Sequence, residues 1–248
     1  MAAADDLGQV WQDVLGTQPR LSDTALLACA AVALVAVWVR RAWRVTRQVV
    51  TIAHEGGHAL VALLVGRRLA GIRLHSDTSG VTVSRGRPTG PGMVATAAAG
   101  YLAPSVLGLV YAAMLAAGRI TALLWLSVAL LAVMLVAIRN AYGVVAVLVT
   151  GLGLFVVSWY APARPQALVA GAFTWFLLLA AFRPLAELQR KRATGRARDS
   201  DVDQLARLTR VPAGMWVATF ALVAAGALAL AATWLLPLAS VRAFATGG

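Results

Sequence analysis

The sequence is poor in the charged residues that cover the surface of soluble proteins. They make up 13% of the 248 residues, against roughly one quarter in ordinary soluble domains. Only ten residues are acidic, whereas 60% are apolar, and the mean hydropathy is +0.77. This shortage of charge excludes an ordinary soluble protein and predicts an integral membrane protein.

Cysteine and histidine are also scarce. The single cysteine, Cys29, excludes a disulfide framework and a metal site built from cysteines. We interpret it as a small buried apolar residue. The whole chain holds three histidines and two glutamates, so a cluster of these residue types is informative.

The N-terminus lacks the basic start that precedes the apolar core of a secretory signal. Residues 1–23 contain one basic residue and four aspartates: Asp5, Asp6, Asp13 and Asp23. We therefore expect residues 1–23 to form a short polar N-terminal segment and not a signal peptide.

Basic residues outnumber acidic residues by 22 to 10, which gives a net charge of +12. They fall in the connections between long apolar stretches and do not form one continuous surface. This distribution is typical of the positive-inside rule of membrane proteins. It predicts the lipid bilayer as a partner and argues against binding of nucleic acid.

Seven apolar stretches approach or exceed the roughly 18 residues that a helix needs to cross a bilayer. They lie at 24–40, 46–66, 93–116, 120–138, 141–160, 165–182 and 212–238. The predicted fold is therefore an all-α polytopic membrane protein with about seven transmembrane helices. We expect a single domain over residues 24–238 and a short C-terminal tail at 239–248.

Two connections carry features of their own. β-branched residues around the turn 76–80 predict a β-hairpin at 70–88, after the second span. Its edge would either bind an unwound substrate segment or be an ordinary surface, and the sequence leaves both open. His75 and Asp77 are expected to be solvated turn residues. The polar connector 183–211 contains Ser200, placed to cap the helix that leads to the last span.

The side with more basic residues should be cytoplasmic. With seven spans, 15 of the 22 basic residues fall on the side that holds the N-terminus, the hairpin and the polar connector. The four arginines between residues 40 and 47 lie on the other side and count against this orientation. The prediction is a multi-pass protein of the bacterial plasma membrane with a cytoplasmic N-terminus.

The second apolar stretch contains the pattern H-E-x-x-H. Two histidines four residues apart on a helix point to the same face, so His54 and His58 can bind one tetrahedral zinc ion. Glu55 would then lie near the metal-bound water. The alternative is a pair of packed core histidines and a glutamate paired with an arginine. Because three of the five His and Glu residues of the chain fall within five positions, we favour the metal site.

These residues resemble the site-2 protease class of intramembrane zinc metallopeptidases, in its smaller bacterial and plant branch. The resemblance covers about residues 45–220 and depends first on His54-Glu55-Gly56-Gly57-His58-Ala59 and the hairpin that follows. The segment Ala99–Ser105 is similar to the A-G-P-x-x-N segment of the family, but Tyr101 replaces the proline, and Pro104-Ser105 at the end of the segment lacks the asparagine. Looser matches follow at Ser200-Asp201, at Leu205-Ala206 and at Pro212.

The family's third zinc ligand commonly comes from an L-D-G motif on a later span, and this chain has no such motif. The resemblance points to Asp201 as the third ligand. Glu187, Asp203 and Asn140 remain alternatives. A catalytic zinc site needs three protein ligands and one open position, so a chain without a third ligand would be an inactive relative.

The resemblance implies a zinc-dependent protease that cleaves a membrane-embedded or membrane-proximal protein. Zinc on His54, His58 and Asp201 would activate water, with Glu55 acting as general base and then general acid. Two other functions remain open: an inactive membrane scaffold of the same family, and a small transporter. A transporter would show internal repeats and polar groups along several spans, and the sequence shows neither. The substrate and the oligomeric state are not predictable from these residues.

Overall fold

The computed structural model describes residues 8, 11–12, 14–194 and 200–236. Within these residues the chain is mainly helical, with one small antiparallel sheet. The predicted C-terminal tail at 239–248 lies outside the described residues. Residues 1–7, 9–10 and 13 of the predicted N-terminal segment also lie outside them.

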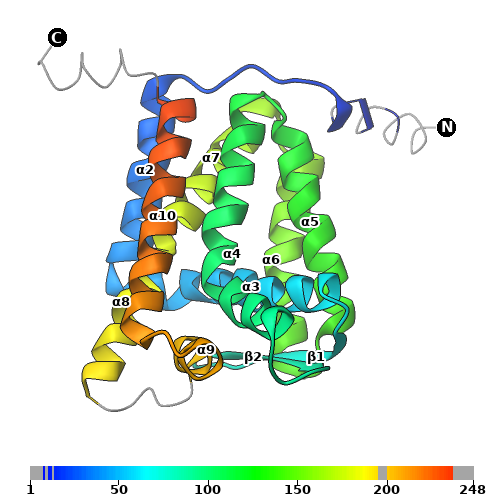
Figure 1. The fold of residues 1–248 in the computed structure, drawn as a ribbon. Coiled ribbons are helices and arrows are strands. Elements are labelled where there is room, and N and C mark those ends of the chain that lie inside the picture. Colours follow the sequence, from blue (N-terminus) through cyan, green and yellow to red (C-terminus); the bar gives the residue numbers. More distant parts are fainter. Residues whose placement is uncertain (1–7, 9–10, 13, 195–199, 237–248) are drawn as a thin grey trace, which may run out of the picture.

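Six helices run side by side as an upright bundle (Figure 1). They are α2 (Asp23–Trp38), α4 (Pro91–Ala116), α5 (Ile120–Ala137), α6 (Ala141–Tyr160), α7 (Ala163–Ala180) and α10 (Ala213–Leu235). Helix α4 contacts α3, α7 and α10, so it occupies the middle of the bundle. As predicted, Cys29 is buried in this core, where its thiol faces α7.

The helix that carries the H-E-x-x-H motif does not stand upright. Helix α3 (Arg40–Leu64) lies across the bundle near one end and is bent by 98° from α2 (Figure 1). The break falls at Val39, whose backbone is extended. The four arginines of the first two turns, Arg40, Arg41, Arg44 and Arg47, explain this position, because charged residues are costly in the bilayer core.

The predicted count of seven spans is therefore not confirmed. Five helices of the described residues are long and apolar enough to cross a membrane, and there are six if α2 and α3 together count as one bent span. The two stretches predicted at 24–40 and 46–66 account for the difference. A hydropathy pattern alone does not distinguish a transverse amphipathic helix from a crossing one.

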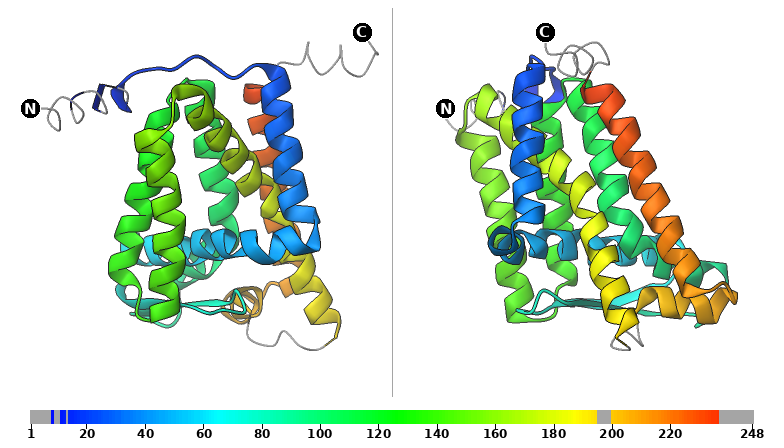
Figure 2. Two further views of the ribbon diagram at one scale, coloured as in Figure 1. Left: turned by 180° about the vertical axis from the view of Figure 1, so that it is seen from behind. Right: turned by 90° about the vertical axis from the view of Figure 1, so that its left-hand side faces the viewer.

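Because α3 lies across the bundle, the segments that lie at the same end of the bundle differ from those predicted. The described part of the N-terminal segment packs at the far end of the bundle, where Gln18 donates a hydrogen bond from its backbone to Gly118 between α4 and α5, at 2.8 Å. The hairpin and the polar connector lie at the opposite end (Figures 1 and 2). The prediction that all three share one side is wrong, because the chain crosses the bundle once and not twice before it reaches the hairpin.

The predicted hairpin is present as strands β1 (Arg68–Leu74) and β2 (Gly80–Arg85), in antiparallel register with Ile72 opposite Thr82. One face packs under α3. The outer edge of β1 is already occupied, because Arg139 donates to the Ile72 carbonyl at 2.8 Å and the Asn140 amide pairs with both backbone groups of Leu74. Among the described residues, no strand or bridge pairs with the outer edge of β2.

The polar connector is folded, with two helices in the described residues: α8 (Phe182–Ala193) and α9 (Asp201–Thr209). A second apolar core holds α9 against α4 and α10. Its members include Leu185, Leu188, Val202, Leu205 and Phe220. Ser200 does occupy the N-cap position of α9, but its hydroxyl donates to the Asp203 carboxylate at 2.5 Å and does not cap the backbone.

Candidate metal centre

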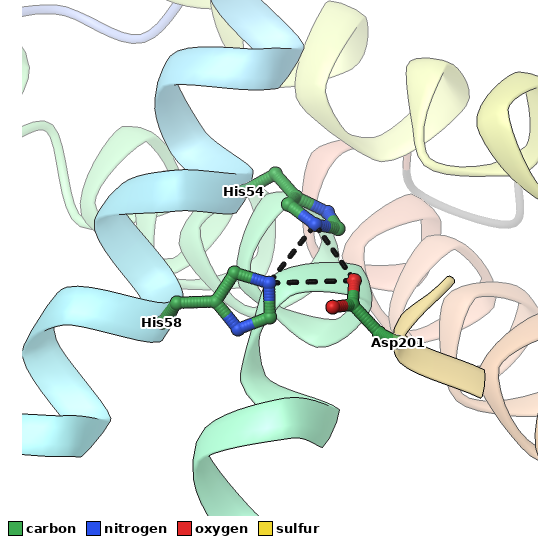
Figure 3. Close-up of side chains that lie close together, drawn as sticks. All are labelled: His54, His58 and Asp201. Carbon is green, nitrogen blue, oxygen red and sulfur yellow. Dashed lines mark hydrogen bonds and ion pairs between the residues drawn. The ribbon is translucent and has the colours of Figure 1, made fainter. Parts of the chain in front are cut away.

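Helix α3 presents its two histidines toward the same point. They are one turn apart, and their Nε2 atoms lie 3.0 Å from each other, with the rings nearly perpendicular (Figure 3). His54 is about one fifth exposed and His58 about one tenth. The spacing in the sequence predicted this convergence.

Asp201 completes a triangle with the two imidazoles. It is the first residue of α9, and its Oδ2 atom lies 3.0 Å from the Nε2 atom of His54 and 3.4 Å from that of His58 (Figure 3). Ligand atoms on a tetrahedral zinc with bonds of about 2.0–2.1 Å lie about 3.3–3.4 Å apart. The three side chains therefore fit zinc after shifts of a few tenths of an ångström, and they leave a fourth position open.

The protonation pattern of His58 supports the same interpretation. Its Nδ1 donates a hydrogen bond to the Thr96 carbonyl at 2.7 Å, so the neutral ring has its lone pair on Nε2. That lone pair faces a second imidazole nitrogen and a carboxylate oxygen. Three such atoms repel one another unless a proton or a cation lies between them. The donor set is thus suited to a divalent metal.

The backbone of α4 passes directly beside the two imidazoles at Gly100. A Cβ atom at this position would lie 2.4 Å from the Nε2 atom of His58 and 2.6 Å from that of His54. Gly57 on α3 makes a similar close approach, since a Cβ atom there would lie 2.4 Å from the Cβ of Ala103. These two glycines allow α3 and α4 to touch where the site is formed. Gly56, by contrast, has room for a Cβ atom, which would make an ordinary contact with the Sδ atom of Met134 at 3.9 Å.

Asp201 is ionised in this setting. Burial opposes its ionisation, but in the metal-free site a proton on the imidazoles of His54 and His58 allows them to donate hydrogen bonds to the carboxylate. These bonds outweigh burial and hold the pKa of the carboxyl well below its usual range. Its side chain remains about a quarter exposed. A negative ligand beside two neutral imidazoles would lower the net charge of a bound zinc ion to +1.

The alternative third ligands have other partners. Glu187 accepts a hydrogen bond from the Trp43 indole at 2.9 Å and pairs with Arg47 at 3.2 Å. Asp203 is bound by Arg192 and Ser200, and Asn140 is bound to β1. Of the described residues, His54, His58 and Asp201 are the group of His, Cys, Asp and Glu side chains that is arranged to hold a metal ion.

The remaining predicted site residue, Glu55, is held by the hairpin. It is 4% exposed, and its carboxylate accepts a hydrogen bond from the Thr82 hydroxyl at 2.6 Å. Gly80 lies so close that a Cβ atom there would be 2.5 Å from the Cγ of Glu55. The strand β2 therefore touches the side chain predicted to be the catalytic base.

Sequence reasoning did not identify Thr82, Gly80, Thr96 or Gly100 as parts of the site. Gly100 is recognisable from the sequence, because it lies in the small-residue segment that resembles the family pattern. Thr82 and Gly80 are not recognisable in this way, because their contact with Glu55 depends on the register of the hairpin under α3. Tyr101, which departs from that pattern, packs edge-on against the His54 ring, with 4.9 Å between the ring centroids. Ser105 is buried further along the same helix.

A family model described as Peptidase M50B-like matches residues 27–231 of the chain. This region includes α3, the hairpin, α4 and α9, and so every residue of the candidate metal centre. Comparison with curated proteins and with solved structures gave no match.

Proposed function

The chain belongs to the Peptidase M50B-like family, the site-2 protease family, and on this premise we propose that it is a zinc-dependent intramembrane protease. Its substrate would be a membrane-embedded or membrane-proximal protein. The observation that carries the proposal is the convergence of His54, His58 and Asp201 from two helices 147 positions apart in the sequence. Glu55 follows His54 in the same helix, and its side chain is buried.

Each residue of the site has a chemical role in this proposal. Zinc held by His54, His58 and Asp201 would act as a Lewis acid that activates water and polarises the scissile carbonyl. Glu55 would take the proton from the attacking water and deliver it to the leaving amine. Thr82 would hold the Glu55 carboxylate in one orientation, and the Thr96 carbonyl would fix the tautomer of His58.

We propose that the unpaired edge of β2 binds the substrate as an added strand. A helical peptide bond is shielded by its own hydrogen bonds, so the substrate has to unwind before cleavage. The β2 edge offers backbone groups to such a segment. Since Thr82 of the same strand contacts Glu55, a strand added there would lie beside the proposed catalytic base.

The orientation that we propose follows from the basic residues. Of the described residues, 16 Lys and Arg side chains lie on α3, the hairpin, the α5–α6 connection, α8 and α9, at one end of the bundle, and three lie at the other: Arg20, Arg119 and Arg164. The first end would face the cytoplasm of a plasma membrane. The described N-terminal segment would then be external, contrary to the orientation expected from seven spans.

An inactive scaffold of the same family is the second candidate. The asparagine of the family pattern is missing from the end of the segment Ala99–Ser105, and among the described residues the buried hydroxyl of Ser105 has no hydrogen-bond partner. The departure lies on α4, within five positions of Gly100. The scaffold and the protease differ in whether Glu55 is needed for a chemical reaction.

The deciding experiment uses Glu55→Gln in purified protein reconstituted into liposomes with a labelled single-span peptide. The amide keeps the size of the side chain and can still accept a hydrogen bond from Thr82, but it is not basic. We expect cleavage to be abolished while the zinc content stays near one per chain. Equal cleavage by wild-type and Glu55→Gln protein would refute the mechanism, and a zinc-loaded wild-type protein that cleaves no membrane peptide would favour the scaffold.

A further inference from the structure

We propose that a groove between the end of α2 and the junction of α7 and α8 binds an anionic phospholipid. Figure 2 shows α2 beside α7 and α8 on one face of the bundle, and α2 and α7 are in contact. The groove has a volume of about 300 Å³. Trp38, Leu179 and Phe182 form part of its apolar wall, and Arg183, Glu187 and Arg190 form its polar side.

The polar side of the groove is cationic. Glu187 is already paired, because Arg183 lies 3.4 Å and Arg47 3.2 Å from its carboxylate. Another nitrogen of Arg183 donates to the Val37 carbonyl at the end of α2. In the part of the chain that the structure describes, the guanidinium of Arg190 has no hydrogen-bond or ion-pair partner. The lining therefore carries two guanidinium groups, Arg183 and Arg190, and one carboxylate, which is also paired with Arg47 outside the lining. This excess of positive charge attracts an anion to the mouth of the groove.

The depth of the groove matches the boundary between acyl chains and headgroups. Helices α7 and α8 together form one 31-residue candidate span, Ala163–Ala193, and about 20 residues suffice to cross the hydrocarbon core. Counted from Ala163, the chain leaves that core near Phe182 and Arg183. Trp38 ends α2 beside this level and is 76% exposed, as an interfacial aromatic anchor would be.

An anionic phospholipid uses both sides of this groove. Its phosphate would contact Arg190 and Arg183, and its first methylene groups would lie on Leu179, Phe182 and Trp38 before the chains enter the bilayer. Basic pockets between helices on the cytoplasmic side of membrane proteins bind anionic headgroups in this way. Inorganic phosphate would leave the apolar wall unused, so the shape favours a lipid over a free anion.

The test titrates phosphatidylglycerol into the purified protein in phosphatidylcholine-containing micelles and counts bound lipid by native mass spectrometry. Arg190→Gln removes the unpaired charge and should weaken binding about fivefold. Ala186→Trp keeps every charge and fills the groove, since Ala186 lines it, and should weaken binding by more than Arg190→Gln does. The matched control is Arg207→Gln, which removes an exposed charge on α9 at the same end of the bundle and should leave binding unchanged.

Three outcomes would overturn the proposal. The first is a wild-type protein that binds phosphatidylglycerol no better than phosphatidylcholine. The second is an equal loss for Arg190→Gln and Arg207→Gln, which would show only general attraction between a basic surface and anionic lipid. The third is unchanged lipid binding but weaker peptide binding in Ala186→Trp, which would assign the groove to a protein substrate. Melting temperatures of all variants in phosphatidylcholine alone control for misfolding.

Discussion

At the scale of single residues, the space around the two histidines depends on the absence of a side chain at Gly100. We predict that Gly100→Ala lowers zinc retention strongly, because its Cβ atom would lie 2.4 Å from the Nε2 atom of His58. Gly226→Ala on α10 is the matched control, since nothing lies within 4 Å of a Cβ atom there. Alanine favours a helix over glycine by up to about 1 kcal/mol, so both variants should keep their helices. Metal analysis after dialysis measures the difference, and equal zinc content in both variants would contradict the prediction.

Thr82 provides a second test at this scale. A hydrogen bond to a charged group contributes about 1.5–3 kcal/mol, so we predict that Thr82→Val lowers kcat by one to two orders of magnitude. KM should change little, because the backbone of β2 is intact. Thr82→Ser keeps the hydroxyl and should restore most of the activity.

The control for Thr82 is Thr51→Val. Thr51 also joins α3 to the hairpin, with a hydrogen bond of 2.8 Å to the Thr78 carbonyl, but among the described residues its hydroxyl makes no hydrogen bond to Glu55. If Thr51→Val and Thr82→Val lose the same activity, Thr82 acts by anchoring the hairpin and not by positioning Glu55. Zinc content should stay at the wild-type level in both.

The residues of the site differ in how far the sequence reveals them. His54, Glu55 and His58 follow from a helical spacing that is fixed by local geometry. Asp201 was reached only through a resemblance, since 142 residues of chain separate it from His58 and its position depends on how α9 docks. Thr82 contacts Glu55 through tertiary packing alone, which no local pattern encodes.

At the scale of elements, the first three residues of α9 contain one proposed metal ligand, Asp201, and one aspartate that pairs within the connector, Asp203. We predict that Asp201→Ala reduces zinc retention with little change in the fold of α9, because the apolar side of α9, with Val202 and Leu205, still packs against α4 and α10. Asp203→Ala should do the reverse. It removes the contacts with Ser200 and Arg192 in the first turn of the helix, at a cost of up to about 1 kcal/mol in stability, and should leave zinc in place.

The measurement for these two variants combines zinc analysis with a thermal melt of the metal-free protein. Comparison in the metal-free state is needed because bound zinc itself stabilises the fold. Unchanged zinc in Asp201→Ala would remove Asp201 from the ligand set. The predicted function would then lack its third ligand, since Glu187, Asp203 and Asn140 are held elsewhere.

Hydropathy predicts the ranges of most elements but not the orientation of α3. The hairpin, the folded connector and the upright helices after residue 90 lie close to their predicted ranges. The exception is the second predicted span, 46–66, because α2 stands upright close to the first predicted range and α3 lies across the bundle. A helix with arginines in its first turns and apolar residues further on is compatible with crossing the membrane or with lying across the bundle, and only its packing against α4 and the hairpin decides between them.

At the scale of the whole molecule, the transverse position of α3 determines the topology. The chain then crosses the bundle once before the hairpin, so the described N-terminal segment and the hairpin lie on opposite sides of the membrane. This arrangement gathers 16 of the described basic residues at one end, a stronger bias than seven spans produce. We therefore expect residue 17 to be external and residue 76 to be cytoplasmic in a bacterial plasma membrane.

Cysteine labelling can test this topology because the chain has one natural cysteine and it is buried. In a Cys29→Ala background, Thr17→Cys and Ser76→Cys each place one thiol at an exposed position at opposite ends of the bundle. A maleimide that does not cross membranes should label Thr17→Cys in intact cells, and Ser76→Cys only after the cells are opened. If α3 crosses the bilayer, the two thiols lie on the same side, so both would be labelled in intact cells or both only after the cells are opened. The inverse pattern would keep the fold but reverse its orientation, and would place the metal centre near the external face.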